Sequence, residues 1–211
     1  MLTIGNFDGV HLGHQEVLRQ VSEQAKQLSL PSIVMTFDPQ PLELFAKDKA
    51  PARLTRLRDK FVQLSKLNIE RLLCVNFNHQ FANQSADEFI SDLLVKRLGV
   101  KFLVVGDDFC FGRGRKGNFA MLQEAGRKYG FEVVSTQSFC LQQLRVSSTA
   151  IREALAQDKL EQAAEMLGRD YSISGRVSHG RKLGRTIGFP TANIPLNVAC
   201  RQFLACIPFK L

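Results

Sequence analysis

Short apolar segments rich in β-branched residues alternate with longer segments of helical periodicity, and this alternation limits the folds open to the chain. Strands are predicted at residues 2–6, 32–37, 71–75, 101–105 and 131–135. Helices are predicted at residues 13–28, 54–67, 85–98, 118–129, 147–155 and 159–167. Strands that alternate with helices of this length form a parallel sheet covered on both faces, so the sequence predicts an α/β fold. In such sheets, ligands bind at the carboxyl ends of the strands, near the point where the strand order reverses.

The chain changes character near residues 168–170. Beyond this point helical periodicity disappears and glycines recur every few residues. We therefore predict a boundary between a first domain, residues 1–168, and a second unit, residues 169–211. The second unit is too short to bury a core of its own.

The net charge is +8, from 28 Lys and Arg residues against 20 Asp and Glu residues. A basic protein suits polyanionic partners, and both nucleic acids and nucleotides with a pyrophosphate are polyanions. The basic residues form only local clusters, at residues 53–60, 113–116 and 181–185. Because the sequence has no basic tail and no alternation of aromatic and basic residues, we expect small-molecule partners and no nucleic acid.

The five cysteines fit free thiols in a reducing cytoplasm. Their number is odd and none lies in a Cys-x-x-Cys pair, so a zinc site and a disulfide framework are poorly supported. The apolar runs are too short to span a membrane, and the first residues lack the basic and apolar regions of a signal peptide. We expect a cytoplasmic protein with no membrane partner.

Residues 5–14, GNFDGVHLGH, follow a predicted strand and open a predicted helix. Their three glycines let the backbone turn tightly and approach a ligand closely. The start of the helix presents unpaired N–H groups, and His11 and His14 can donate hydrogen bonds to phosphate oxygens. The segment is therefore a candidate phosphate site. Two alternatives stay open: a structural turn with incidental histidines, and a metal site whose further ligands are not identified.

A second glycine-rich stretch, residues 106–117, follows the predicted strand at residues 101–105. Asp107 or Asp108 could bond a ribose hydroxyl or belong to the water shell of a magnesium ion. The alternative is a solvated acidic turn beside a basic cluster.

A third candidate site begins the predicted helix at residues 147–155. Ser147, Ser148 and Thr149 can cap this helix and donate hydroxyls to an anion. Arg152, one turn further, can fork two phosphate oxygens. The alternative is a plain helix cap followed by an amphipathic helix.

These motifs resemble those of the bacterial bifunctional riboflavin kinase/FMN adenylyltransferases, also called prokaryotic FAD synthetases. The HLGH of residues 11–14 is similar to the nucleotidyltransferase signature, and the SSTAIR of residues 147–152 to its second half. Residues 106–112 resemble the family's Gly-Asp-Asp-Phe-x-Phe-Gly stretch, and residues 37–41 resemble its proline-stiffened flap. The resemblance covers residues 2–168.

The resemblance implies a Rossmann-like nucleotidyltransferase domain that transfers AMP from ATP to FMN, giving FAD and pyrophosphate with the help of Mg²⁺. The implied catalytic residues are His11, His14 and Arg152. The implied ATP- and phosphate-binding residues are Gly5, Asn6, Phe7, Gly9, Gly13, Ser147, Ser148 and Thr149. The implied FMN-binding residues are Phe37, Pro39, Asp107, Asp108 and Phe109.

Residues 175–193 resemble the riboflavin kinase signature, which implies a β-barrel domain with riboflavin as its substrate. The implied ATP-binding residues are Gly184, Thr186 and Pro190, and the implied magnesium ligands are Thr191 and Asn193. The chain has no Asp or Glu after Asp170, although such a kinase needs a carboxylate to accept the proton of the riboflavin hydroxyl. We therefore expect a truncated barrel that has lost kinase activity.

Three alternatives to FMN adenylylation remain at this point. The chain could be a nucleotidyltransferase for a phosphopantetheine or a pyridine nucleotide, although the flap and the second motif disfavour this. It could be a basic nucleic-acid-binding module without chemistry. It could also be a folded but inactive remnant of the family.

Overall fold

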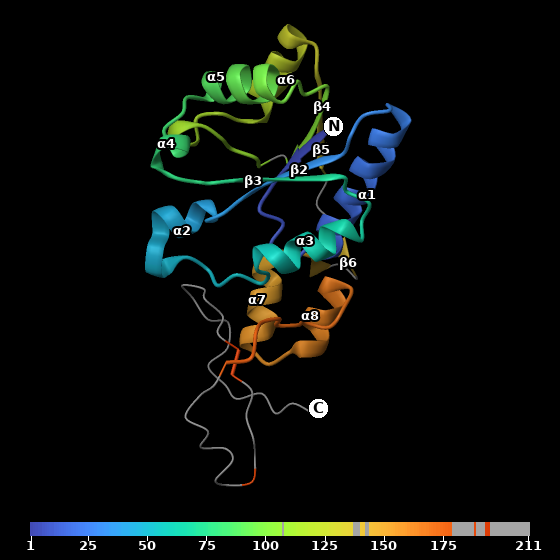
Figure 1. The fold of residues 1–211 in the computed structure, drawn as a ribbon, viewed down its shortest axis with the longest axis vertical. Coiled ribbons are helices and arrows are strands. Elements are labelled where there is room, and N and C mark those ends of the chain that lie inside the picture. The colour runs from blue at the N-terminus through green and yellow to red at the C-terminus, as the bar shows by residue number, and fades with distance from the viewer. Residues whose placement is uncertain (107, 137–139, 142–143, 179–187, 189–192, 195–211) are drawn as a thin grey trace.

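The computed structural model describes residues 1–106, 108–136, 140–141, 144–178, 188 and 193–194. Its centre is a five-stranded parallel sheet with the strand order β3-β2-β1-β4-β5 (Figure 1). The strands are β1 (Leu2–Ile4), β2 (Ile33–Phe37), β3 (Arg71–Val75), β4 (Phe102–Gly106) and β5 (Glu132–Thr136). The predicted parallel α/β fold is confirmed, and each strand lies close to its predicted position.

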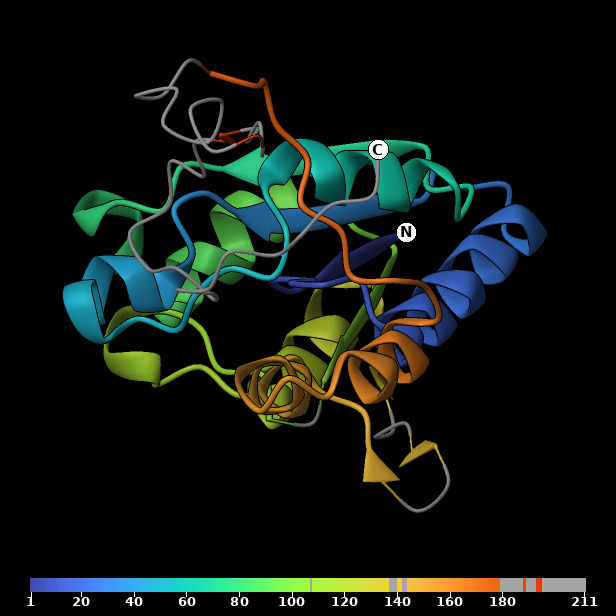
Figure 2. The same ribbon diagram turned by 90° about the horizontal axis from the view of Figure 1, so that it is seen from below.

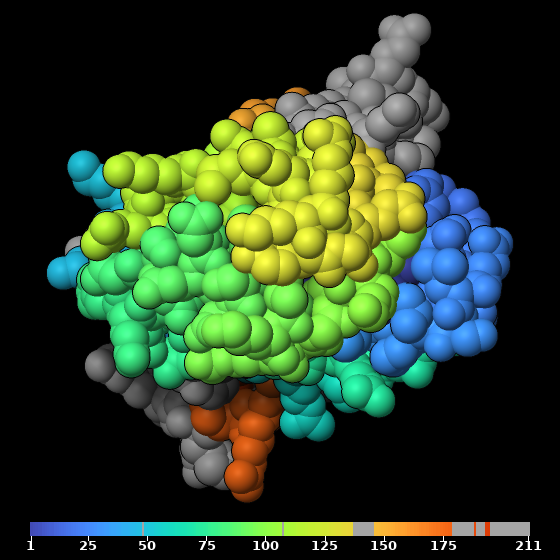
Figure 3. Space-filling model, turned by 90° about the horizontal axis from the view of Figure 1, so that it is seen from above, coloured from blue at the N-terminus to red at the C-terminus, as the bar shows by residue number. Residues whose placement is uncertain are grey.

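One face of the sheet packs against η2 (Phe89–Arg97), a π-helix, and α6 (Phe119–Tyr129). Leu2, Met35 and Leu103 point toward this side and are fully buried. Figure 3 shows the outer surface of this layer, formed by the green and yellow parts of the chain. The alternation of buried residues along each strand follows from the two-residue period of a β-strand.

The opposite face packs against α1 (Leu12–Gln27) and α3 (Leu57–Ser65). Val34, Phe102 and Val104 point toward these helices. The sheet is therefore covered on both sides, which explains why its strands are apolar on both of their faces.

The strand order reverses between β1 and β4. The chain lays down β1, β2 and β3 toward one edge, then crosses over to add β4 and β5 on the other side. The loops that leave the carboxyl ends of β1 and β4 carry the first and second candidate motifs. Both loops thus lie at the switch point, where α/β sheets hold their ligands.

The remaining elements are short or follow the sheet. They are α2 (Pro41–Ala46), η1 (Lys47–Lys49), α4 (His79–Ala82), α5 (Ala86–Glu88), η3 (Arg113–Arg115), β6 (Cys140–Leu141), β7 (Leu144–Arg145), α7 (Ser148–Ala156) and α8 (Leu160–Leu167). Helices α7 and α8 form a hairpin that shares an apolar cluster, in which Leu54 is buried beside Ile151 and Leu155. The segment after α8 turns back past α3 (Figure 2), where the hydroxyl of Ser174 donates to the carboxylate of Asp59.

Two predicted helices differ from the structure in detail. The helix predicted at residues 54–67 begins at Leu57, after Arg56 in an extended conformation, and the N–H groups of Leu54 and Thr55 before it donate to the carboxylate of Asp8. The helix predicted at residues 85–98 starts as α5 and widens into the π-helix η2. Helical periodicity in the sequence carries no signal for either difference.

Few residues of the predicted second unit belong to the described part of the chain. Ser178 and Asn193 form an antiparallel bridge, in which the Ser178 N–H donates to the Asn193 carbonyl at 2.8 Å. Gly184, Thr186, Pro190 and Thr191, as well as Asp107 of the second motif, lie outside the described residues. None of the described helices is long and apolar enough to cross a membrane.

Candidate active site

The loop between β1 and α1 (residues 5–11, the β1–α1 loop) turns sharply at the switch point. Gly9 has a φ of +83°, and a Cβ atom there would lie 2.9 Å from a methyl carbon of Leu54, so both its backbone and its surroundings require glycine. Phe7 and Val10 also have positive φ angles, 46° and 43°, which are rare for bulky residues. Such backbone conformations occur where surrounding contacts hold a loop for function.

His11 and His14 stand side by side at the start of α1. Their rings stack with centroids 3.6 Å apart and planes 18° apart, and the edge of Phe7 meets the His14 ring at 5.1 Å. The Nδ1 atom of His11 accepts from the N–H of His14 at 3.3 Å and so caps the helix. In the neutral ring the proton then sits on Nε2, which makes Nε2 the donor that His11 offers to a ligand.

Both rings are neutral at pH 7. Burial lowers the pKa of His11 to about 4, with Asp8 opposing this shift and Arg169 adding to it. Burial also holds the pKa of His14 well below its usual range, helped by His11 and by the ammonium of Lys60. No group in the described part of the chain bonds the buried Nδ1 of His14. Two neutral imidazoles can lie in contact, whereas two imidazolium rings would repel each other.

This neutrality predicts a pH-dependent stability. The unfolded chain binds a proton at His11 near pH 6.5 and the folded chain only near pH 4, so the free energy of unfolding should fall as the pH drops from about 6.5 to about 4. At ~1.4 kcal/mol per pH unit, the loss from His11 reaches at most about 3 kcal/mol. Denaturant unfolding at pH 7, 6 and 5 measures it. His11→Asn should flatten the slope, whereas the same change at the exposed His79 should not; equal slopes in both variants would contradict the assignment.

Asp8 is the centre of the site, and the sequence analysis did not single it out. Its buried carboxylate accepts from the Leu54 N–H at 3.0 Å, and from the N–H and hydroxyl of Thr55 at 3.0 and 3.1 Å. The Arg152 guanidinium donates to it at 2.5 Å from Nη2, and Arg152 Nε donates to the Ala52 carbonyl at 2.6 Å. Asp8 therefore joins three distant parts of the chain.

The third motif meets the first through this residue. The Ser148 hydroxyl donates to the Asp8 carbonyl at 2.9 Å, and Ser147 caps α7 by accepting from the Ala150 N–H at 3.1 Å. Thr149 is exposed. The structure thus brings Arg152 and one of the three predicted hydroxyls, that of Ser148, to the β1–α1 loop, and both groups bond the protein there. Contact of these groups with a phosphate stays a prediction.

Lys60 holds the other side of the β1–α1 loop. This buried lysine of α3 donates to the Asn6 carbonyl at 2.6 Å and to the Thr36 hydroxyl at 3.2 Å. The neighbouring basic residue of the same sequence cluster, Arg53, lies elsewhere: it binds Glu43 at 2.5 Å and Asp38 at 2.7 Å. Two cations of the basic cluster at residues 53–60 are therefore bonded within the protein, Lys60 beneath the β1–α1 loop and Arg53 beside β2 and α2, whereas Arg58 of the same cluster is exposed.

A row of aromatic rings runs from the β2–α2 loop (residues 38–40) to the second motif. Phe37, predicted in the flavin site, contacts Phe77 at 5.5 Å, and exposed Phe45 contacts Phe77 at 5.9 Å. The row continues through Phe81, Phe89 and Phe111 to Phe109, with centroid distances between 5.0 and 6.3 Å. The sequence analysis missed Phe77 and Phe81, because no motif marks them.

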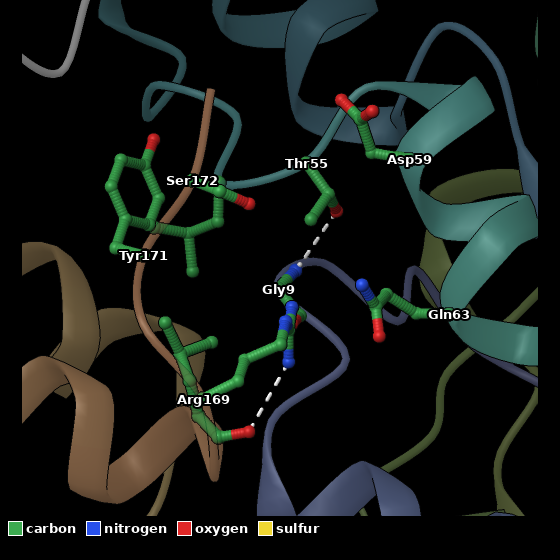
Figure 4. A pocket seen from close by; sticks show the side chains of 9 residues that line it. Gly9, Thr55, Asp59, Gln63, Arg169, Tyr171 and Ser172 are labelled. Atoms are coloured by element: carbon green, nitrogen blue, oxygen red, sulfur yellow. Dashed lines mark hydrogen bonds between the residues drawn. The ribbon is translucent and has the colours of Figure 1, made fainter. Parts of the chain in front are cut away.

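A small pocket lies beside the β1–α1 loop (Figure 4), and none of the predicted flavin residues that the structure describes lines it. It is lined by Gly9, Leu54, Thr55, Asp59, Gln63, Leu167, Arg169, Tyr171 and Ser172. Arg169 reaches across it and donates to the Gly9 carbonyl at 2.5 Å and to the Val10 carbonyl at 3.1 Å. Of the residues predicted to bind phosphate, Gly9 alone lines this pocket, so the pocket does not coincide with the predicted substrate site.

Among the described residues, no group of three His, Cys, Asp or Glu side chains could hold a metal ion. The Asp8 carboxylate oxygens already accept hydrogen bonds from backbone N–H groups and from Arg152. Asp108 is exposed. The described side chains therefore do not fit a resident magnesium site. Asn193, a predicted ligand, forms the backbone bridge to Ser178, and its carbonyl also accepts from the Ser178 hydroxyl at 3.4 Å.

The family model for FAD synthetase matches residues 1–150. The chain belongs to the FAD synthetase family. The family model for riboflavin kinase matches residues 167–203 of the same chain. Both matches agree with the family predicted from the motifs.

Curated proteins similar to this chain carry the name bifunctional riboflavin kinase/FMN adenylyltransferase. The protein from Escherichia coli K12 is 60% identical over 196 residues, which is 93% of this chain and 63% of the relative. The protein from Haemophilus influenzae is 58% identical, with 93% and 64% covered. The chain therefore spans less than two thirds of the length of these relatives.

A solved structure also matches the fold. It is titled as a macrolide-efflux protein from Streptococcus pneumoniae, with a TM-score of 0.75 and 31% identity. The match covers 93% of this chain and 64% of the other. A TM-score of 0.75 over this share of the chain indicates a common fold.

Proposed function

We propose that this chain transfers AMP from ATP to the phosphate of FMN, forming FAD and pyrophosphate. The observation that carries the proposal is the stacked pair of neutral histidines at the start of α1, placed at the switch point of the sheet. The adjoining aromatic row supplies apolar rings for a flavin, and the relatives' names include FMN adenylyltransferase.

In the proposed reaction, an oxygen of the FMN phosphate attacks the α-phosphorus of ATP. The bond from that phosphorus to the pyrophosphate oxygen breaks, and pyrophosphate leaves with the electron pair. Because the FMN phosphate is itself the nucleophile, no bond to the protein forms. The protein then contributes positioning and stabilisation of the charge that develops on the phosphates.

The proposed roles follow from the geometry of the β1–α1 loop. His11 donates from Nε2, since its Nδ1 is engaged in the helix cap, and His14 contributes a second imidazole beside it. The start of α1 adds the positive end of its dipole. Arg152 and Asp8 fix the loop to α7, and Ser147, Ser148 and Thr149 stand at the start of that helix. ATP enters as its magnesium complex, as part of the substrate.

We also propose that residues 1–168 form the adenylyltransferase domain. Helices α7 and α8 support this limit, since they share a buried cluster with Leu54 and end at Gly168 in a left-handed cap. Residues 171–211 contain no Asp or Glu, so we propose that this chain does not phosphorylate riboflavin by itself. The cytoplasmic location stays a prediction.

A chromatographic assay of the purified chain tests the function. With Mg-ATP and FMN we expect FAD and pyrophosphate, and with Mg-ATP and riboflavin we expect no FMN. Replacing FMN by a pyridine mononucleotide or phosphopantetheine should give no product. A folded protein that makes no FAD would refute the proposal, and salt-sensitive RNA binding without ATP turnover would favour a nucleic-acid-binding module instead. FMN made from riboflavin would refute the loss of kinase activity.

A further inference from the structure

Lys60 lies buried beneath the two loops that the proposed substrates would occupy. Of the lysines that the structure describes, it is the buried one, with 2% of its surface exposed. Its ammonium donates to the Asn6 carbonyl in the β1–α1 loop and to the Thr36 hydroxyl, one residue before the end of β2. The Thr36 hydroxyl in turn donates to the same Asn6 carbonyl at 3.2 Å. The ammonium and the Thr36 hydroxyl together thus tie the β1–α1 loop to the end of β2.

Burying the ammonium of Lys60 beneath the β1–α1 loop costs free energy, because the charge loses its water. In the described part of the chain no carboxylate lies within 4 Å of it, and burial lowers the pKa of Lys60, with Asp8 opposing. An apolar side chain of similar volume would pack here without the cost of removing a charge from water. The two oxygens that the ammonium binds therefore point to a role in holding those loops and not in stabilising the core.

The contacts on either side of Lys60 lead to the two proposed substrates. Asn6 is followed by Phe7, whose ring edge meets His14, so the nucleotide side of the site is anchored through the β1–α1 loop. Thr36 is followed by Phe37, the first ring of the aromatic row on the flavin side. Transfer of AMP requires the attacking phosphate oxygen and the α-phosphorus to be aligned, so the spacing of these loops is what must be kept.

We propose that Lys60 is a positioning residue for adenylyl transfer, because its ammonium locks the β1–α1 loop and the end of β2 at a fixed distance. This inference rests on the proposed function. It assigns to Lys60 no contact with either substrate.

Lys60→Met keeps the length and the apolar stem of the side chain and removes the charge. We expect kcat for FAD formation to fall about 100-fold, with KM for ATP and for FMN changed by less than about threefold and the melting temperature not lowered. Lys66→Met, at the exposed position just after α3, is the control and should behave as the wild type. A wild-type kcat in folded Lys60→Met, or a raised KM with unchanged kcat, would overturn the proposal.

Thr36→Val provides a second variant that leaves the lysine in place. It should lower kcat about fivefold, since it removes the hydroxyl that accepts from the Lys60 ammonium and donates to the Asn6 carbonyl but leaves the bond from Lys60 to Asn6. Added to Lys60→Met it should lower kcat by less than it does in the wild type, since the bond from the ammonium is already gone and only the bond from the Thr36 hydroxyl to the Asn6 carbonyl is left to lose. A wild-type kcat in Thr36→Val, or fully additive effects in the double variant, would refute the proposal even if Lys60→Met alone failed to fold.

Amide hydrogen exchange separates this inference from the proposed function. If the wild type makes no FAD, the proposed function fails, and Lys60→Met is then compared with the wild type without substrates. Faster exchange confined to residues 5–11, with β5 unchanged, supports the positioning role. Unchanged exchange in residues 5–11, or faster exchange throughout the sheet, overturns it.

Discussion

Asp8→Asn is expected to lower the free energy of unfolding by about 3–5 kcal/mol, the usual cost of removing one partner from a buried ion pair. The amide nitrogen of asparagine would face the N–H donors of Leu54 and Thr55, and the Arg152 guanidinium would lose its carboxylate. Denaturant titration measures the change, with an unaltered m-value showing that the folded state is otherwise intact.

The control for this substitution is Asp92→Asn. Asp92 forms an ion pair with Lys96 at 3.0 Å, but both side chains are about half exposed or more, at 48% and 71%. Exposed pairs of this kind contribute less than about 1 kcal/mol. A loss below about 1 kcal/mol in Asp8→Asn would mean that the buried pair does not hold the loop in the way described above.

Replacing either histidine of the stacked pair is expected to lower kcat for FAD formation by about 100- to 1,000-fold, with little change in folding. This is the usual cost of removing one hydrogen-bond donor from a site that stabilises developing charge. His11→Asn and His14→Asn keep a polar side chain but move its donor away from the phosphates. The measurement is steady-state FAD formation over a range of ATP and FMN concentrations.

His79→Asn is the matched control for both substitutions. His79 lies exposed on α4, and in this variant kcat should equal that of the wild type. If His11→Asn and His14→Asn also kept the wild-type kcat, the histidine pair would be structural and the first alternative of the sequence analysis would hold. A raised KM for ATP with unchanged kcat would instead show that the pair binds ATP equally in the ground and transition states.

The strands and most helices could be predicted because their signal is local. β2 is a short run rich in apolar and β-branched residues, and α6 is flanked by Asn118 and Gly130, the residues that cap it. The first and third motifs could also be found, since each is a short pattern with its own chemistry. Their contact could not be predicted, because Asp8 and Arg152 are 144 residues apart and neither pattern specifies the partner of the other.

The burial of Lys60 could not be predicted from the sequence either. In the sequence it belongs to a basic cluster, which ordinarily forms a solvated face, and only the packing of α3 on the sheet reveals that its side chain points inward. The start of α3 was misplaced for a related reason, since Leu54 fits the apolar spacing of the helix but packs instead against Ile151 and Leu155. Errors of this kind arise wherever a long-range contact decides the position of a residue.

Arg169 bonds the carbonyls of Gly9 and Val10, so the two predicted units of the chain are not structurally independent. In sequence, Arg169 is the first residue of the second unit, yet in space it belongs to the framework of the first. Cutting the chain after Gly168 would leave the proposed adenylyltransferase domain without the hydrogen bonds from Arg169 to its β1–α1 loop. If the second unit is exchanged for another, in the laboratory or during evolution, the β1–α1 loop therefore keeps these bonds only when the new junction also has an arginine at this position.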